Sequence, residues 1–315
     1  MTDGDHPRPR DGFRSPRFGQ PATFMRLPHV REPRGLDVAM VGVPYDGGTS
    51  YRPGARYGPR HIREQSSLIR PFNPVLGVAP FERLRVADCG DVDVAPVSID
   101  ETFAAVEREI DAVMAAGAIP LAVGGDHSVT LPILRSVARR HGPLAVVHFD
   151  SHPDTWGDYG GSRHYHGSTF RRAIEEGIVD GGRVIQIGIR GPIYGADDFD
   201  FHARHGLEVI RIDEVKTEGV ARALGRVARL EGRPAYCSFD IDAVDPAYAP
   251  ATGTPEVGGL TAYEALGLVR GLRGLDLVGA DVVEVAPPYD GPGAITGLLA
   301  ANLLFELLSV LALRR

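Results

Sequence analysis

The stretch that decides the fold is residues 118–154, AIPLAVGGDHSVTLPILRSVARRHGPLAVVHFDSHPD. It opens with a short apolar run, continues through an amphipathic stretch of helical length, and closes with a second apolar run followed by charged residues. Short apolar runs on either side of an amphipathic helix are typical of a strand–helix–strand unit with parallel strands. Residues 118–154 therefore predict a parallel sheet that is buried on both faces.

The same alternation extends outward in both directions. Further short apolar runs rich in β-branched residues are VAMVGV, RVIQIGI, LEVIRI, AYCSFDI and LVGADVVEV, and ETFAAVEREIDAVMAAG is a further amphipathic stretch. The final segment, ITGLLAANLLFELLSVLALRR, predicts a closing helix packed on the sheet or at a subunit contact. No internal repeat or low-complexity linker divides these elements. We therefore predict an α/β fold, a single three-layer α/β/α domain with a mostly parallel sheet, over residues 23–315.

Residues 1–22 differ in composition from this domain. They are polar and rich in proline and glycine, which leaves too little apolar surface for them to pack alone. We predict a flexible N-terminal arm that is loose in solution or lies on a neighbouring subunit.

Overall composition limits the classes of function. With 43% hydrophobic and 24% charged residues, the 315-residue chain has the composition of an ordinary globular protein. Its net charge of −7, without a basic stretch after the first residues, argues against nucleic acid as a partner. No apolar run uninterrupted by charge is long enough to span a bilayer, and Cys89 and Cys237 stand far apart, which does not indicate a disulfide framework. We expect a cytoplasmic protein with a small-molecule partner and no membrane partner.

Polar residues directly follow three of the apolar runs, and they are the candidate metal ligands. Ligands of open α/β sheets bind beyond the carboxyl ends of the strands, so these residues are where chemistry is expected. In an extended chain alternate residues face the same way, so the carboxylates and imidazoles after each run are expected to share one face. The set is His127, Asp150, His152, Asp154, Asp240 and Asp242.

Six such residues are too many for one closed metal site but suit two metals that share carboxylates. A ligand set dominated by carboxylates, with about one imidazole per metal and no thiolate, favours Mn²⁺ before Mg²⁺, with Zn²⁺, Co²⁺ and Ni²⁺ as further alternatives. The competing interpretation is that each acidic pair merely caps a helix or anchors a loop. The coincidence of these residue types at three strand ends favours a metal centre.

Two nearby polar residues are interpreted differently. His148 lies inside the apolar run before Asp150, and we expect it to be a hydrogen-bonded core residue that points away from Asp150. Ser128 follows His127 but lacks the GxSxG pattern of a nucleophile elbow, so a serine nucleophile is not expected.

At these residues the chain resembles the arginase and agmatinase family of ureohydrolases. The resemblance is carried by GGDHS at 124–128, DSHPD at 150–154, SFDIDAVDPAYAPATGTPE at 238–256, EVAPPYD at 284–290 and VGVPYDGGTSYRPGARYGPRHIR at 41–63. It extends from about Thr23 to near the C-terminus. The segments TFMRLPH, PGARYGPR and ATGTPE are similar to agmatinases, guanidinobutyrases and proclavaminate amidinohydrolase more than to arginases. Ser151, Pro153 and Ala251 depart from the residues usual in the family.

The resemblance implies an arrangement of the metal ligands. One metal would be held by His127, Asp150, Asp154 and Asp240, and the other by Asp150, His152, Asp240 and Asp242. Asp150 and Asp240 would then bridge two Mn²⁺ ions in each subunit. The resemblance also implies a homotrimer or homohexamer.

The resemblance further implies roles in catalysis. The reaction would be hydrolysis of a linear guanidino compound to urea and an amine, for which the metals activate a water molecule. Glu284 would pair with the guanidinium group and orient its carbon. Asp242 would pass a proton to the leaving amine, and His166 would lie near the leaving nitrogen. His164 competes with His166 for that role on sequence alone.

The resemblance also orders the candidate substrates. Resemblance favours agmatine, hydrolysed to putrescine and urea, followed by 4-guanidinobutyrate or another guanidino acid, with arginine and formimidoylglutamate behind. The loop TWGDYGGSRHY offers Asp158 for a cation, Arg163 and His164 for an anion, and Trp156 and Tyr159 as walls. A catalytically inactive metal-binding relative is the alternative from another class, and the intact ligand set argues against it.

Overall fold

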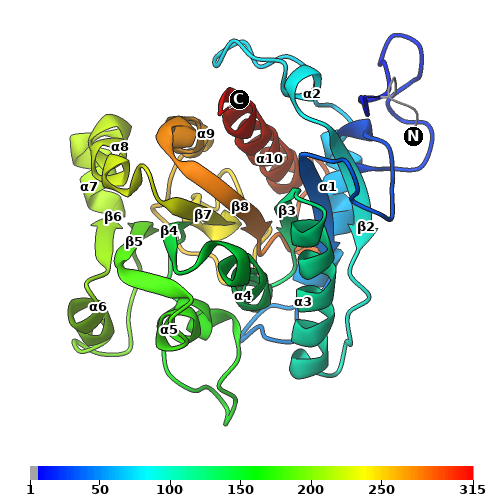
Figure 1. The fold of residues 1–315 in the computed structure, drawn as a ribbon. Coiled ribbons are helices and arrows are strands. Elements are labelled where there is room, and N and C mark those ends of the chain that lie inside the picture. The colour runs from blue at the N-terminus through cyan, green and yellow to red at the C-terminus, as the bar shows by residue number, and fades with distance from the viewer. Residues whose placement is uncertain (1–5, 315) are drawn as a thin grey trace.

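Eight strands form one sheet in the computed structural model, which describes residues 6–314, and all seven neighbouring pairs are parallel. The order across the sheet is β2-β1-β3-β8-β7-β4-β5-β6 (Figure 1). The strands are β1 (Val38–Val43), β2 (Val86–Asp91), β3 (Ile119–Gly124), β4 (Leu144–Phe149), β5 (Val179–Ile189), β6 (Glu208–Arg211), β7 (Pro234–Asp240) and β8 (Asp276–Val283). The predicted parallel sheet is confirmed.

Helices cover both faces of the sheet and complete three layers (Figure 1). On one face lie α3 (Ile99–Ala115), α4 (Thr130–His141), α5 (Thr169–Glu175) and α6 (Asp200–His205). On the other lie α1 (Gly58–Ser66), α2 (Pro80–Arg83), α7 (Ile212–Glu218), α8 (Val220–Val227), α9 (Ala262–Arg270) and α10 (Ile295–Leu313). Alternate residues of each strand enter the two cores: Val38 and Met40 pack on the α10 side, and Ala39 and Val41 on the α3 side. This is the predicted three-layer α/β/α architecture.

Strand β2 is the element that the apolar runs do not predict. Its sequence, VADCGD, contains two aspartates and a glycine, which lowers its resemblance to a buried strand. The structure buries Asp88 because Arg63 of α1 and the backbone N–H of Phe24 both donate to its carboxylate. Cys89, in the same strand, is buried and free, as is Cys237.

Helix α10 is long and apolar enough, by length and composition alone, to cross a membrane, but most of it is buried inside the protein. It packs against α1, α9 and β8, so it is the predicted closing helix on the sheet. Glu306 within it is buried and accepts hydrogen bonds from Arg270 and Asn73. A paired carboxylate of this kind is tolerated in a protein core.

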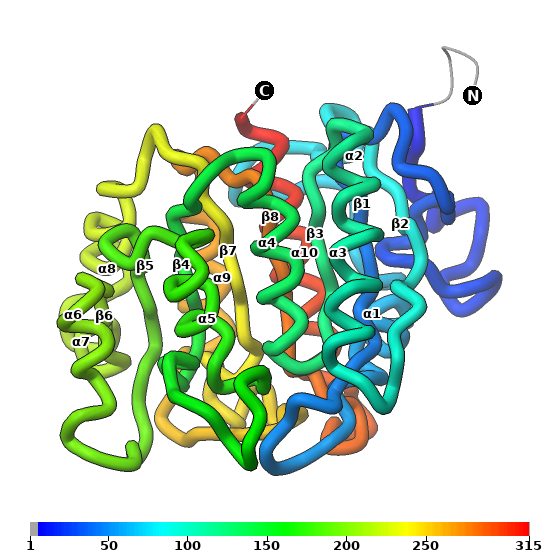
Figure 2. Tube along the Cα trace, turned by 60° about the horizontal axis from the view of Figure 1, so that its bottom comes forward, coloured from blue at the N-terminus to red at the C-terminus, as the bar shows by residue number. Residues whose placement is uncertain are grey.

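The predicted N-terminal arm is described only from residue 6, because residues 1–5 lie outside the described part of the chain. Residues 6–22 form no helix or strand, and Figure 2 shows their trace beside β2 and α1. His6 Nε2 lies 2.8 Å from the carbonyl oxygen of Phe81, and the side chains of Phe13 and Phe18 are exposed. The boundary at residue 22 and the flexibility of the arm stay predictions.

Candidate metal centre

The predicted ligands meet at the carboxyl edge of the four central strands, β3, β8, β7 and β4, which are neighbours in the sheet. His127 follows β3, Glu284 follows β8, Asp240 ends β7 and Asp150 follows β4. Parallel strands end at the same edge, so residues far apart in the sequence converge there. The structure brings together all eight predicted site residues; their roles as ligands and catalysts stay predictions.

The local chain path differs from the extended backbone expected after β4 and β7. β4 ends at Phe149, the backbone N–H of His152 donates to Asp150 Oδ1 at 2.6 Å, and Asp154 has a left-handed φ of 49°. In the same way, the N–H of Asp242 donates to Asp240 Oδ1 at 2.8 Å. The expectation that an extended chain aligns these residues was therefore wrong. Each first aspartate folds the chain into a turn, and the turn brings the following ligands to the same side.

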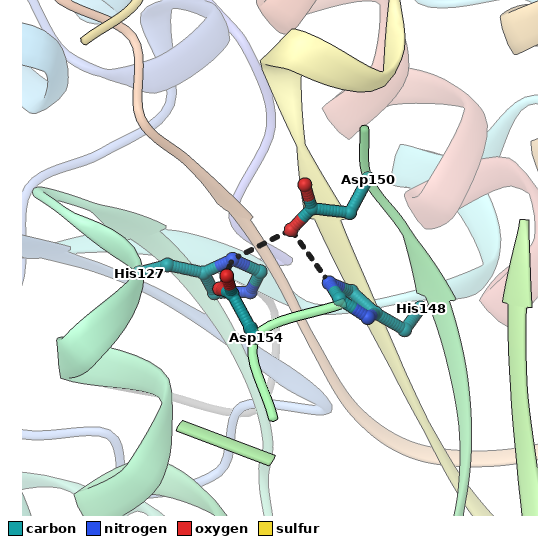
Figure 3. A group of neighbouring side chains, drawn as sticks. All are labelled: His127, His148, Asp150 and Asp154. Atoms are coloured by element: carbon teal, nitrogen blue, oxygen red, sulfur yellow. Dashed lines mark hydrogen bonds and ion pairs between the residues drawn. The ribbon is translucent and has the colours of Figure 1, made fainter. Parts of the chain in front are cut away.

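A first group of ligands surrounds the Nδ1 atom of His127. This nitrogen lies 3.0 Å from Asp154 Oδ2 and 3.2 Å from an Oδ2 of each of Asp150 and Asp240. Figure 3 shows His127, Asp150 and Asp154 directed toward one another. His127 Nδ1 is buried and has no hydrogen-bond partner of good geometry among the described residues. A buried ring nitrogen surrounded by three carboxylates suits a bound cation.

A second group of ligands, formed by Asp150, His152 and Asp242, lies beside the first. His152 Nδ1 is 3.1 Å from Asp242 Oδ2 and 3.5 Å from Asp150 Oδ1. Asp150 therefore directs Oδ2 at the first group and Oδ1 at the second. This is the geometry expected of a carboxylate shared by two metals.

The charges of the two groups are unbalanced in the protein alone. Burial and the neighbouring Asp242 and Asp150 raise the pKa of Asp240 well above its usual value. Although burial lowers the pKa of His127, its contacts with Asp150, Asp154 and Asp240 raise that pKa well above the usual value. Both shifts show that the cluster attracts positive charge. The residue types and the His127 Nδ1 atom, which has no hydrogen-bond partner among the described residues, fit two divalent cations, in agreement with the predicted metal centre.

His148 does not point away from Asp150, so the expected orientation was wrong. Its Nε2 atom lies 2.7 Å from Asp150 Oδ2, because residues two apart on a strand face the same side. Figure 3 shows the two side chains in contact. The expectation of a hydrogen-bonded core residue was right: His148 is fully buried, and Gln186 Nε2 donates to its Nδ1 at 2.9 Å. With Nδ1 accepting, Nε2 carries the proton and donates to Asp150, so neither nitrogen is free to bind a metal.

Gln186 extends this network to α6. Its Oε1 atom accepts a hydrogen bond from His202 Nε2 at 2.8 Å. His202 is almost fully buried, and burial and the neighbouring His148 lower the pKa of His202 to about 4. His202 is therefore neutral in the folded protein at neutral pH.

This shift predicts an acid-sensitive contribution of His202 to stability. An unfolded histidine titrates near ~6.5, so on acidification the unfolded chain binds a proton that the folded protein does not. The contribution is present above about pH 6.5 and is lost as the pH falls towards 4. When the pH falls from 7 to 5, the free energy of unfolding of the parent should drop by about 2 kcal/mol more than that of His202→Gln. The measurement is urea unfolding of both proteins at equal metal content. Equal losses in the two proteins would refute this assignment.

Glu284 lies beside the first ligand group, between His127 and His166. Its Oε1 atom accepts from the backbone N–H of His127 at 2.9 Å and lies 3.0 Å from His166 Nδ1. Its Oε2 atom is buried and has no hydrogen-bond partner among residues 6–314. Glu284 also has a left-handed φ of 65°, a conformation that is costly for a non-glycine residue and common at functional sites. The open oxygen is placed to accept from a cationic N–H donor such as a guanidinium group.

Of the two histidines, His166 lies beside Glu284 and His164 does not. His164 turns away from the ligands, with Nδ1 3.5 Å from Asp100 and its ring against Phe103. His166 is buried beside Glu284, and its Nε2 lies 2.7 Å from Ser50 Oγ. Although burial lowers the pKa of His166, its contact with Glu284 raises that pKa to about 9.

Two residues that support the site were not singled out from the sequence, Asp126 and Ser50. Asp126 is fully buried and accepts from the N–H of Gly48 at 2.7 Å, and the carbonyl of Gly48 accepts from the N–H of His166. Burial and the neighbouring Glu284 raise the pKa of Asp126 to about 6. The signal available in the sequence was an aspartate directly before the ligand His127, at a strand end. Ser50 carried no comparable signal.

A cavity of about 280 Å³ opens beside the ligands. Trp156 and Tyr159 line it, as predicted, together with Tyr165, Tyr194, Thr254 and Glu256. The charged residues of the same loop do not line it. Asp158 pairs with Arg172, and Arg163 lies 3.4 Å from Glu175, and a contact of either residue with the substrate stays a prediction.

Comparisons with known proteins agree with this geometry. Residues 36–309 match the Arginase family. The chain is 52% identical over 310 residues to guanidinopropionase of Pseudomonas aeruginosa, covering 98% of this chain and 97% of the relative. It is 48% identical over 308 residues to guanidinobutyrase of the same organism, covering 96% of each. It is also 48% identical over 290 residues to mitochondrial agmatinase of Gallus gallus, covering 92% of this chain and 85% of the relative.

Solved structures of related proteins have a similar fold. Proclavaminate amidino hydrolase from Streptomyces clavuligerus is similar with a TM-score of 0.92 and 44% identity, covering 96% of this chain and 100% of that one. A formiminoglutamase variant of Trypanosoma cruzi, solved with Mn²⁺, is similar with a TM-score of 0.80 and 26% identity, covering 88% and 94%.

Proposed function

The chain belongs to the arginase family, and from that premise we propose that its substrate is a short linear guanidino acid, such as 3-guanidinopropionate or 4-guanidinobutyrate. It is a hydrolase that acts on C–N bonds of linear amidines, within a family that depends on a binuclear metal centre. The observation that carries the proposal is the placement of Glu284, with an open buried oxygen, beside the two ligand groups.

The proposed reaction adds water across one C–N bond of the guanidinium group and yields urea and an amine. When bound, two divalent ions supply the Lewis acidity that makes a water molecule acidic enough to attack the guanidinium carbon. Glu284 Oε2 holds a guanidinium N–H and so orients the carbon over the ligands. Asp242 accepts a proton from the attacking water and passes it to the leaving nitrogen, and His166 lies beside that nitrogen.

The far end of the substrate extends into the cavity. Its aromatic walls, Trp156, Tyr159 and Tyr194, suit a short chain of methylene groups. The hydroxyl groups of Tyr159, Tyr194 and Ser50, which line the same cavity, are candidate donors for a carboxylate. Two relatives that match nearly the whole chain bear names of guanidino-acid hydrolases, which supports the same choice.

Agmatine, the first expectation from resemblance alone, is the second candidate. Glu256 also lines the cavity and offers a carboxylate for the agmatine ammonium. The buried guanidinium of Arg190, which contacts the carbonyl oxygen of Glu256, offsets part of that negative charge. One relative at 48% identity bears the name agmatinase.

The test is urea release from 3-guanidinopropionate, 4-guanidinobutyrate, agmatine and arginine, measured on the Mn²⁺-loaded parent and on Glu256→Gln. We expect kcat/KM for one guanidino acid to exceed that for agmatine at least about ten-fold, a difference of about 1.4 kcal/mol. Glu256→Gln should leave that preference in place. Highest activity on agmatine, lost in Glu256→Gln, would instead establish the second candidate. A fully loaded protein that releases no urea from any of them would overturn both.

We propose Mn²⁺ as the metal, because carboxylates dominate both ligand groups and each has one imidazole. The solved relative that contains Mn²⁺ supports this choice.

Metal removal should abolish turnover and leave the fold largely intact. The two hydrophobic cores pack on either side of the sheet and lie outside the ligand groups, unlike the core of a zinc finger. Far-ultraviolet circular dichroism should therefore change little on chelation, while urea release disappears and returns with added Mn²⁺. Unfolding of the chelated protein would contradict this expectation.

We also propose a homotrimer or homohexamer, on the strength of the family resemblance and the exposed phenylalanines of residues 6–22. Light scattering that gives a monomer at micromolar concentration would overturn it.

A further inference from the structure

A buried chain of hydrogen bonds leads away from the ligand groups through His127. His127 Nε2 lies 2.8 Å from Ser238 Oγ, and the Ser238 hydroxyl donates to Asp281 Oδ1 at 2.7 Å. The other carboxylate oxygen of Asp281 accepts from the hydroxyls of Thr130 and Tyr236, each at 2.7 Å. All five residues are 0% exposed. A fully buried polar chain of this kind requires every donor and acceptor to be matched.

The matching fixes where the His127 proton lies. Asp281 acts as an acceptor, because three hydroxyl groups donate to its two carboxylate oxygens. Burial and Asp281 raise the pKa of Tyr236 well above its usual value, so that hydroxyl remains a donor. The Ser238 hydroxyl has one hydrogen to donate, and it donates it in the hydrogen bond to Asp281. The Ser238 oxygen therefore accepts a hydrogen bond from His127 Nε2. When a metal displaces the proton from Nδ1, His127 is neutral, its remaining proton stays on Nε2, and the lone pair of Nδ1 faces the first ligand group.

We propose that Ser238 and Asp281 are positioning residues for one of the two metals. They hold His127 in the tautomer that leaves Nδ1 free, and they fix the plane of its ring. A metal-binding histidine is commonly oriented by an acceptor on its other nitrogen, and here a serine relays that role from a buried carboxylate.

The fold holds this relay, formed by Ser238 and Asp281, in a fixed position. Ser238 of β7 and Asp281 of β8 are paired residues on neighbouring strands, and Thr130 is the first residue of α4. The rings of His148 and Phe170 lie against His127, with centroids 5.1 and 5.4 Å away. The His127 ring is therefore held on its sides by packing and at its far nitrogen by Ser238.

The relay reaches only the first ligand group. The second group takes its imidazole from His152, whose Nδ1 faces Asp242 and Asp150, with the Ser151 hydroxyl 3.1 Å away. Loss of the relay should therefore weaken the binding of one metal and leave the binding of the other unchanged. A general loss of folding would affect both alike.

The experiment is a Mn²⁺ titration of Ser238→Ala, which leaves His127 Nε2 without its acceptor. We expect affinity for one ion per subunit to fall by roughly ten- to a hundred-fold, with the other ion retained, as is usual for partners of metal-binding histidines. Elemental analysis after dialysis at fixed free Mn²⁺ gives the stoichiometry. Electron paramagnetic resonance distinguishes a lone ion from a coupled pair.

Two further variants distinguish the positioning of His127 from a general effect on the stability of the protein. Tyr236→Phe removes a donor to Asp281 but keeps the relay to His127, so it should lower the melting temperature and still bind two ions at the parent affinity. Ser238→Thr keeps the hydroxyl and should recover the parent affinity. The proposal is overturned if Ser238→Ala binds both ions like the parent, or if Tyr236→Phe loses an ion to the same extent. A parent protein that binds no Mn²⁺ would overturn the metal centre itself, a result distinct from either of these.

Discussion

Asp150→Asn should yield a folded protein that binds fewer than two metals and releases urea at least about a thousand-fold more slowly than the parent, a loss of about 4 kcal/mol. The reason is the double role of this carboxylate. Asp150 Oδ2 faces His127 and its Oδ1 faces His152, so both ligand groups depend on it. An amide has one oxygen and no charge, and its nitrogen presents protons where a ligand is required.

Fold and metal content have to be measured together for this variant. His148 should still donate to the amide oxygen at position 150, so the strand end is expected to keep its shape. Asp111→Asn serves as the control, because Asp111 lies at an exposed position of α3 and pairs with Arg139. If Asp150→Asn bound two metals as tightly as the parent, the assignment of Asp150 as a bridging ligand would be wrong.

The architecture was predictable because its central strands are continuous apolar runs. Residues 118–154 alone contain β3, α4 and β4 in the order in which the structure has them. β2 was not predictable from the same pattern, since Asp88 looks like a surface residue until Arg63 and the N–H of Phe24 are placed against it. Such a partner comes from elsewhere in the chain, and local periodicity contains no information about it.

The site was predictable in its residue types and less so in its geometry. Carboxylates and imidazoles after strand ends indicated a metal centre, whereas the turns that align them depend on hydrogen bonds such as that from the His152 N–H to Asp150. Asp281 lies inside the apolar run of β8 and shows no sign of its role until Ser238, on the paired strand, places it near His127. Long-range pairing decides such roles, and a single sequence does not reveal it.

Glu284→Gln should keep both metals and lose most of its activity. Glu284 contacts the site through the His127 backbone N–H and His166, not through a predicted ligand atom, so metal content should not change. The glutamine oxygen can replace Oε1 as the acceptor for the His127 N–H. Its NH₂ group then occupies the position of Oε2 and presents protons to a cationic substrate in place of a charge.

The expected size of the effect follows from that replacement. Removing a desolvated charge from its charged partner costs on the order of 2–5 kcal/mol, which is a fall of roughly thirty-fold to several-thousand-fold in kcat/KM. Metal stoichiometry and urea-release kinetics must be measured on the same preparation. Glu82→Gln, an equal change of charge at an exposed position of α2, should behave like the parent. Loss of metal from Glu284→Gln, or near-parent activity on every guanidino substrate, would show that Glu284 does not bind the guanidinium group.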